Sequence, residues 1–448
     1  MPRLPPGPRL PGVVQSLLFI RSPYVFVRKC QERYGDIISM HSAAIGKFVY
    51  LADPVDIEAL FAQDGKKAHA GEANAAIEPV TGPNSILLLD RERHLAERRL
   101  LSPAFHGDAI RNLEEVARKA TEREMQKWED GAVLAARPAM QRITFEVIVR
   151  AVLGVENPEL RKRLLDAFEP VFKVSPAALL PAFQIDLGSL SPYGRFRRAI
   201  ERLDQVLFDL ISERRATDPQ QDILGMLLAA KNAEGQPLDD RHIRDEMVTL
   251  LLAGHETTAT ALAWALELLA RHPRVLDEAR SALATDQDEL IEAVAAETLR
   301  VRPVVLDVWR RLSEPMELGG YRLPAETTVL PAIYLVHSDS RRHSRPADFD
   351  PLRFDGGRPP RDIWLPFGGG RRRCLGASLA QMELRVILSA ILAEFVFEPT
   401  SNRPEQPRFR GVTLAPARGA RLRARRRPIV SKHEPLRASP EQGTAQRP

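Results

Sequence analysis

The stretch "PFGGGRRRCLGASLA" at residues 366–380 surrounds one of only two cysteines in a chain of 448 residues. Three glycines and three arginines stand directly before Cys374, and a helical pattern begins at Gly376. Positive charge and helix N-terminal amides stabilise a thiolate, while glycines permit a tight turn and close approach of a flat ligand. The pattern therefore favours a metal-ligating thiolate over a structural thiol. Zinc is disfavoured because no second cysteine or histidine lies at metal-ligand spacing.

The composition is that of an ordinary globular protein, with 44% hydrophobic and 27% charged residues. Two cysteines cannot form a disulfide framework, which favours a reducing compartment. The apolar run at 13–20 is interrupted by Gln15 and Ser16, and a spanning helix needs about 20 apolar residues. No secretory cleavage site follows that run. We therefore predict a cytoplasmic protein without a transmembrane anchor.

The net charge is only +5, and much of the excess lies in "RGARLRARRR" at 418–427. We interpret this stretch first as a solvated strand edge or tail. A docking patch for an acidic partner is the second interpretation, and a nucleic-acid-binding arm is the third. The chain has no zinc-finger spacing and no interleaving of aromatic and basic residues, so we predict no nucleic-acid partner.

Apolar residues at three- and four-residue spacing predict long helices at 110–131, 195–216 and 242–273. The third is apolar on most faces between Leu250 and Leu266, which predicts an interior position. Strand-like segments are short and lie near 37–43, 47–53 and 316–332. The predicted fold class is therefore mainly α with a minor β-sheet region.

No repeat or linker divides the chain, which predicts a single domain over 1–427. The polar, proline-bearing segment 428–448 is predicted to be a disordered tail. The segment 173–194 carries three prolines and neither period, so we predict a loop that covers a site.

The cysteine stretch resembles the haem-ligand signature of the cytochrome P-450 superfamily, in the pattern Phe367-x-x-Gly370-x-Arg372-x-Cys374-x-Gly376. With no anchor, the chain is similar to soluble bacterial-type members. The resemblance implies a haem b buried between a long distal helix and the helix that follows the cysteine loop. Cys374 would be the axial thiolate ligand of the haem iron, which favours O–O cleavage. Phe367 would pack beside the thiolate, and Arg372 would meet a haem propionate.

The sequence "AGHETT" at 253–258 resembles the oxygen-activation motif of the same family. Ala253 and Gly254 are small enough to leave room for dioxygen. Thr257 follows Ala253 by four residues, so its hydroxyl can donate to the Ala253 carbonyl and locally open the helix. Glu256 supplies an acid that can relay protons.

Glu297-x-x-Arg300 resembles the Glu-x-x-Arg helix of the family, although such a pair alone is common surface decoration. The segment "DFDPLRF" at 348–354 lies between this pair and the cysteine, as the Pro-x-Arg-Phe element of the family does. The resemblance implies that Arg353 joins Glu297 and Arg300 in a buried charged cluster. That cluster would support the cysteine loop without taking part in catalysis.

Haem propionates need cationic partners from separate segments. His94 and Arg98 are one helical turn apart and match the family pattern for a propionate contact. Arg310 occupies the position of another propionate arginine, although Arg311 is its neighbour and alignment alone does not separate them. Asp307 could touch a polar substrate group or pair with Arg310 or Arg311, and we favour pairing.

The resemblance implies a haem-dependent monooxygenase that inserts one atom of dioxygen into a lipophilic organic substrate, by hydroxylation or epoxidation. No Gly-x-Gly-x-x-Gly follows a strand, so electrons would come from separate proteins, a ferredoxin-type donor with its reductase. Two alternatives are a peroxide-using haem-thiolate peroxygenase and a non-enzymatic haem sensor or carrier. Glu256 and Thr257 argue against both, since neither alternative needs a proton relay.

Overall fold

Helices account for most of the described chain, so the predicted mainly α fold class is confirmed. The computed structural model describes residues 4–427 apart from 44, 173–184, 218–221, 233–234, 286 and 355–358. The predicted tail at 428–448 and most of the predicted loop at 173–194 lie outside these residues. The helices are α1 (Gly12–Arg21), α2 (Pro23–Tyr34), α3 (Pro54–Phe61), α4 (Ala70–Ala73), α5 (Glu78–Thr81), α6 (Arg91–Leu101), α7 (Asp108–Met125), α8 (Ala136–Leu153), α9 (Pro158–Phe172), α10 (Pro192–Arg215), α11 (Ile223–Ala229), α12 (Asp240–Arg271), α13 (Pro273–Leu283), α14 (Glu289–Val301), α15 (Ile333–His337) and α16 (Ala377–Glu394).

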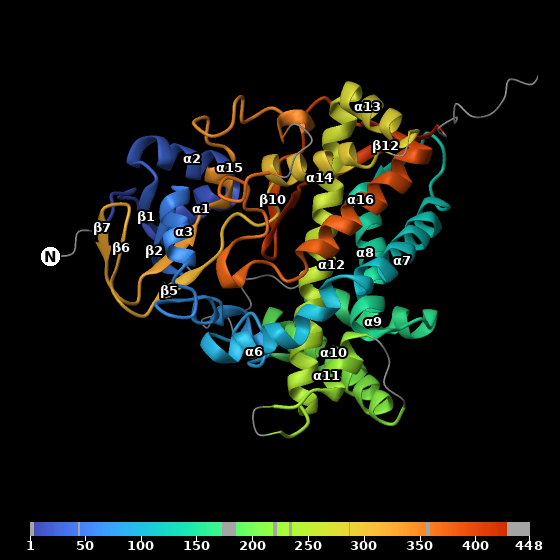
Figure 1. Ribbon diagram of the computed structural model, residues 1–448, viewed down its shortest axis with the longest axis horizontal. Coiled ribbons are helices and arrows are strands. Elements are labelled where there is room, and N and C mark those ends of the chain that lie inside the picture. Colours follow the sequence, from blue (N-terminus) through green and yellow to red (C-terminus); the bar gives the residue numbers. More distant parts are fainter. Residues whose placement is uncertain are drawn as a thin grey trace, which may run out of the picture.

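Helix α12 runs through the centre of the molecule and packs against α8 and α16 (Figure 1). It begins where the Asp239 side chain accepts a hydrogen bond from the main-chain amide of His242, an N-cap that satisfies a free donor. It ends before Pro273, whose ring cannot continue a helix. Most of its residues are buried, including the whole of Thr258–Ala270, as predicted from its apolar faces.

The strands are short and form four separate sheets. The largest has the order β1-β2-β8-β5-β3. Strands β1 and β2 lie at the predicted segments 37–43 and 47–53, whereas the predicted segment 316–332 contains β8 and also the separate hairpin β6-β7. Figure 1 shows this sheet beside α1, α2 and α3, on the opposite side of the molecule from α7, α8 and α9. The strands are β1 (Ile37–Ser42), β2 (Gly46–Leu51), β3 (Ala68–His69), β4 (Val133–Ala135), β5 (Arg310–Leu312), β6 (Met316–Leu318), β7 (Tyr321–Leu323), β8 (Thr328–Pro331), β9 (Phe395–Pro399), β10 (Pro407–Arg410), β11 (Thr413–Pro416) and β12 (Arg421–Arg426).

The basic stretch 418–427 contains strand β12, which is the middle strand of the sheet β4-β12-β9. The prediction of a strand edge or tail was therefore wrong. Leu422 and Ala424 point into the core and are each 1% exposed, whereas the intervening arginines point away from it. Two of them form ion pairs, Arg425 with Glu398 and Arg426 with Glu394. The alternation of apolar and basic residues is that of a strand with one buried face.

Two kinds of core hold these elements together. One lies among the helices and includes α8, α12 and α16, and the other lies on the two faces of the large sheet. Trp264 of α12 is fully buried, and its indole N–H donates to the Leu414 carbonyl of β11 at 2.8 Å. In the part of the chain that the structure describes, no helix has the length and apolar character needed to cross a bilayer.

Candidate functional site at the cysteine loop

The loop before Cys374 is tightly folded against α3. Residues Gly370–Arg372 form one 3-10 turn, and the Cys374 amide donates to the Phe367 carbonyl at 2.9 Å. Gly370 has a φ of +64°, and a Cβ there would lie 2.4 Å from the Asp64 carboxylate. Both facts require glycine at this position. The loop then leads into α16, for which Gly376 is the N-cap residue.

The Cys374 side chain is exposed, unlike that of Cys30, which is buried in the core. The surrounding protein still removes much of its hydration, which raises the pKa of the thiol. The Gly376 amide and the guanidinium groups of Arg373 and Arg98 act in the opposite direction and lower this pKa. The loop therefore provides the donors and cations that a bound thiolate needs.

Helix α12 is open to solvent at one short stretch. Ala253 is exposed and Thr257 is half-buried, whereas the residues on either side of this stretch are almost all buried. The Thr257 hydroxyl donates to the Ala253 carbonyl at 2.5 Å, as the four-residue spacing predicted. The helix stays continuous here, so the expected local opening is not present.

Gly254 lies against α8. A Cβ at this position would stand 2.5 Å from Cδ1 of Ile148, so a larger residue would require the Ile148 side chain to shift. The structure thus gives a packing reason for the small residue. Its predicted place beside dioxygen stays a prediction.

Glu256 is buried and fully engaged by neighbouring side chains. It forms an ion pair with Arg137 at the start of α8, and Gln141 donates to its other oxygen at 2.7 Å. Thr260 also donates to this carboxylate, at 3.3 Å. Arg137, Gln141 and Thr260 therefore orient the Glu256 side chain beside the open stretch of α12.

Four basic residues that the sequence assigned to propionates come from three segments of the chain. His94 and Arg98 lie on α6, Arg310 lies on β5, and Arg372 lies in the cysteine loop. Burial lowers the pKa of His94 to about 4, with further lowering by Arg372, Arg98 and Arg310. These charges influence one another because the fold brings the segments together.

The four basic residues differ in their partners. Arg310 is 2% exposed and pairs with Asp64 at 2.5 Å, while Arg311 is partly exposed and pairs with Glu326. Arg372 pairs with Asp90. It also donates to main-chain carbonyls of the segment before α6, those of Ile86 and Leu89.

Arg98 is half-buried and has no carboxylate partner among the described residues. Desolvation lowers the pKa of this guanidinium, while Cys374 raises it and Arg373 lowers it. Among these groups, Arg98 is therefore the guanidinium left available to an external anion.

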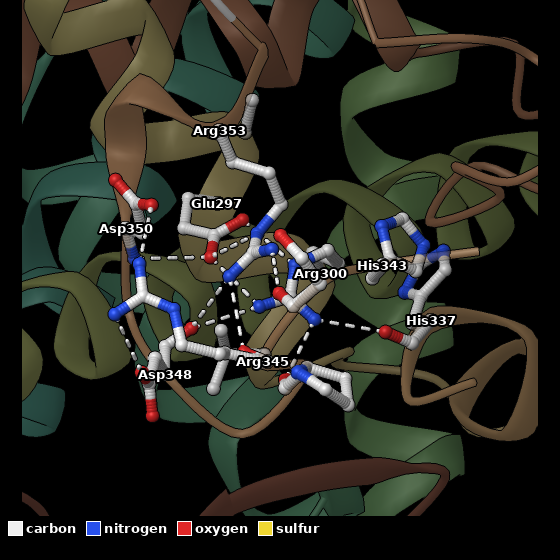
Figure 2. Close-up of polar contacts among 12 residues, drawn as sticks. Glu297, Arg300, His337, His343, Arg345, Asp348, Asp350 and Arg353 are labelled. Carbon is white, nitrogen blue, oxygen red and sulfur yellow. Dashed lines mark hydrogen bonds and ion pairs between the residues drawn. The ribbon is translucent and has the colours of Figure 1, made fainter. Parts of the chain in front are cut away.

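Figure 2 shows the cluster formed by Glu297, Arg300 and Arg353. Arg300 is 1% exposed and donates to both oxygens of the fully buried Glu297 at 2.7 Å. Arg353 donates to the same carboxylate at 3.1 Å, and so does the main-chain amide of Asp350. The remaining Arg300 donors reach the main-chain carbonyls of His337, Pro346 and Asp348. The cluster is closed, because each of these buried charges is satisfied within the chain.

Asp307 pairs with neither Arg310 nor Arg311, so that prediction was wrong. It accepts hydrogen bonds from the Tyr50 hydroxyl and the Trp309 indole, both at 2.6 Å. The large sheet is the reason, since β2 places Tyr50 opposite Leu330 of β8, next to this segment. Burial raises the pKa of Asp307, while the two donors lower it.

The sequence analysis did not predict the hydrogen-bond and ion-pair partners of the predicted site residues. Arg137 and Gln141 bind Glu256, whereas Asp64 and Asp90 bind two of the arginines. Asp90 had a weak signal, because it stands just before the segment in which His94 and Arg98 are one helical turn apart. The others lie far from their partners in sequence and have no local signal.

The side chains present fit a haem. An iron porphyrin with anionic propionates needs a soft axial ligand, a cation and space beside the iron. The exposed Cys374 sulfur, the Arg98 guanidinium without a carboxylate partner among the described residues, and the open stretch of α12 meet these needs.

The sequence matches the cytochrome P450 family over residues 5–422, which is nearly the whole chain. The chain therefore belongs to the cytochrome P450 family, whose members are haem-thiolate monooxygenases. Membership implies a haem cofactor, dioxygen, redox partners and a small-molecule substrate in general terms.

Named relatives agree with this assignment. A protein named cytochrome P450 135B1 from Mycobacterium tuberculosis is 42% identical over 432 residues, covering 94% of this chain and 91% of the relative. One named cytochrome P450 135A1 from the same species is 35% identical over 425 residues, covering 94% and 95%. The solved structure of retinoic acid bound cyanobacterial CYP120A1 superposes with a TM-score of 0.84 at 24% identity. It covers 95% of this chain and 100% of that one, and it shows that the fold is shared.

Proposed function

We propose that this chain binds haem b and inserts one atom of dioxygen into a lipophilic organic substrate, by hydroxylation or epoxidation. The observation that carries the proposal is the exposed thiol of Cys374 among the Gly376 amide and the guanidiniums of Arg98 and Arg373. When bound, a thiolate-ligated haem supplies the O–O cleavage and the oxidation of carbon. Cys374 is proposed as its axial ligand, with Phe367, Gly370 and Gly376 shaping the loop around the sulfur.

We assign proton handling to Thr257 and Glu256. The Thr257 hydroxyl donates to the Ala253 carbonyl at the open stretch, so it can hold a proton where the reacting oxygen would lie. Glu256 lies next in the chain and is tied to Arg137 and Gln141. Arg137 and Gln141 orient the Glu256 carboxylate, and movement of this ion pair would let Glu256 pass a proton inward.

The propionates are assigned to His94, Arg98, Arg310 and Arg372. Arg98 supports this assignment most directly, since it has no carboxylate partner among the described residues. Arg310 forms an ion pair with Asp64, and Arg372 forms one with Asp90. These two arginines would therefore bind the propionates through their remaining N–H donors. Arg311 is partly exposed and paired with Glu326, which favours Arg310 over its neighbour.

Electrons are proposed to come from a ferredoxin-type donor with its reductase. Arg371 and Arg373 are both exposed and flank the ligand loop. A cationic face there would steer an acidic protein toward the cysteine side of the molecule. A cytoplasmic location stays a prediction.

The decisive experiment is an absorption spectrum of the purified protein, reduced and exposed to carbon monoxide. The wild-type chain should give the strongly red-shifted Soret band of a thiolate-ligated haem, and Cys374→Ser should lose it. The matched control is Cys30→Ser, which removes the other cysteine and should keep the band. A Cys374→Ser protein with an unchanged band would refute the ligand assignment, and a pyridine haemochrome spectrum of another haem type would refute haem b.

A further inference from the structure

A second group of metal-ligating side chains lies between α6 and α12, apart from the cysteine loop. Glu97 comes from α6, whereas His242 and Glu246 lie one turn apart on the same face of α12. One ligand atom from each residue lies within 4.8 Å of the others. The His242 imidazole Nε2 is 3.1 Å from Oε2 of Glu97.

The two carboxylates of this group are buried, and three of their four oxygens lack hydrogen-bond partners among the described residues. Glu246 is 0% exposed and Glu97 is 6% exposed. Neither oxygen of Glu246 has a hydrogen-bond partner among the described residues, nor has Oε1 of Glu97. A buried carboxylate without partners is costly, so these oxygens need a proton or a cation. Their neighbour Asp245 differs, because Asn84 and Arg244 satisfy its carboxylate.

We propose that Glu97, His242 and Glu246 form a binding site for a divalent transition-metal ion such as Zn2+. One imidazole nitrogen among the ligands favours such an ion over Mg2+ or Ca2+, which prefer oxygen. Tetrahedral zinc with ligand bonds of about 2.0–2.1 Å needs ligand atoms about 3.3 Å apart, so small side-chain movements close the site. His242 is 19% exposed along its side chain, which leaves an entry for the ion and a fourth position for water.

The electrostatics agree with this geometry. Burial raises the pKa of Glu246 well above its ordinary value, with further raising by Glu97 and Asp245. The Ile86 main-chain amide lowers this pKa somewhat, although it does not meet hydrogen-bond geometry with either carboxylate oxygen. A divalent cation would displace the proton that Glu246 otherwise holds. The bound ion would also tie α6, which carries Arg98, to the half of α12 that precedes the open stretch.

The test uses tag-free, haem-loaded full-length protein, stripped with a chelator and dialysed against Zn2+. Elemental analysis should find one zinc per chain. Glu246→Gln removes a ligand, so it should weaken zinc binding by more than roughly 100-fold, the upper end of the effect of residues that only contact a ligand. Glu72→Gln is the matched control and should bind like wild type, because it lies in a different His and carboxylate grouping whose Asp90 is already paired. Zinc-edge X-ray absorption should show one imidazole, carboxylate oxygens and no sulfur.

Equal zinc affinity in wild type and Glu246→Gln would overturn the proposal, and so would a sulfur ligand in the absorption spectrum. His242→Asn provides a second variant on the more accessible side of the group, in case Glu246→Gln does not yield haem-loaded protein. It should show the same loss of zinc. None of these readouts depends on monooxygenase activity, so failure here leaves the proposed function untouched.

Discussion

The cluster around Glu297 and the candidate haem site around Thr257, Cys374 and Arg98 differ in where their polar groups find partners. Glu297 is fully buried and accepts hydrogen bonds from Arg300, Arg353 and a main-chain amide. Ala253 and Cys374 are exposed, and Arg98 has no carboxylate partner among the described residues. The first region satisfies its charges internally, whereas the second leaves its functional groups accessible.

This difference distinguishes residues that stabilise the fold from residues that we propose take part in the reaction. A closed network fixes the backbone on which it rests, and removing one member leaves a buried charge unpaired. An open group contributes little to folding, because its partner is supplied from outside the chain. Substitutions in the Glu297 cluster should therefore lower the free energy of unfolding, whereas substitutions at the candidate haem site should lower activity.

The largest effect is expected for Glu297→Gln. Removing this carboxylate charge leaves Arg300 buried without a counter-ion, which should lower the free energy of unfolding by about 3–5 kcal/mol. Urea unfolding measures the loss, and haem retention should fall with it. Glu326→Gln is the control: its ion pair with Arg311 is exposed, so it should cost less than about 1 kcal/mol. Equal losses in both variants would contradict the closed-cluster interpretation.

A smaller effect of another kind is expected for Thr257→Ala. The free energy of unfolding should stay close to wild type, while dioxygen-driven product formation should fall roughly 100-fold, as for loss of a proton-transfer group. Thr257→Ser retains the hydroxyl that donates to Ala253 and should keep most of the activity. Peroxide-driven turnover should persist in both variants. Unchanged dioxygen-driven turnover in Thr257→Ala would exclude this residue from proton delivery.

The smallest effect concerns His337, which lies beside the closed cluster. Burial lowers the pKa of this imidazole to about 3, with further lowering by His343 and Arg300, and its Nε2 accepts from the Leu365 amide at 2.7 Å. The unfolded chain binds this proton near pH 6.5, so stability should fall as the pH drops below that value.

His337→Gln keeps an acceptor but cannot titrate. Between pH 7 and pH 5.5, wild type should lose roughly 1 kcal/mol more stability than this variant, as measured by urea midpoints at each pH. His106→Gln changes an exposed histidine and should keep the wild-type pH dependence. Parallel pH profiles for wild type and His337→Gln would show that His337 is not held neutral.

Local patterns predicted the parts of the fold that depend on local physics. The long helix α12 was predicted from the three- and four-residue spacing of its apolar residues, and its interior position from its apolar faces. The short strand-like segments at β1 and β2 were also predicted. The hydrogen bond from Thr257 to Ala253 followed from a four-residue spacing. The family signature supplied Cys374, whose role no spacing rule could establish alone.

Long-range pairing was harder to predict. Strand β12 was interpreted as an edge or tail because its arginines outnumber the small and apolar residues that face the core. Asp307 was assigned to its nearest arginines, whereas the sheet brings Tyr50 to it from the other end of the chain. Glu97 and Glu246 form no sequence pattern, and only the approach of α6 to α12 places them together.

The position of β12 also affects the order of folding. Its residue Arg421 pairs with Ala135 of β4, so the middle strand of this sheet is supplied by the last described part of the chain. Strand β4 therefore has no partner strand until residues 421–423 are available to pair with it. Such distant pairing makes folding slow, since the loop closure must precede the contacts that stabilise it. A chain that stops before residue 421 would leave β4 and β9 without the strand that lies between them, and so with exposed edges.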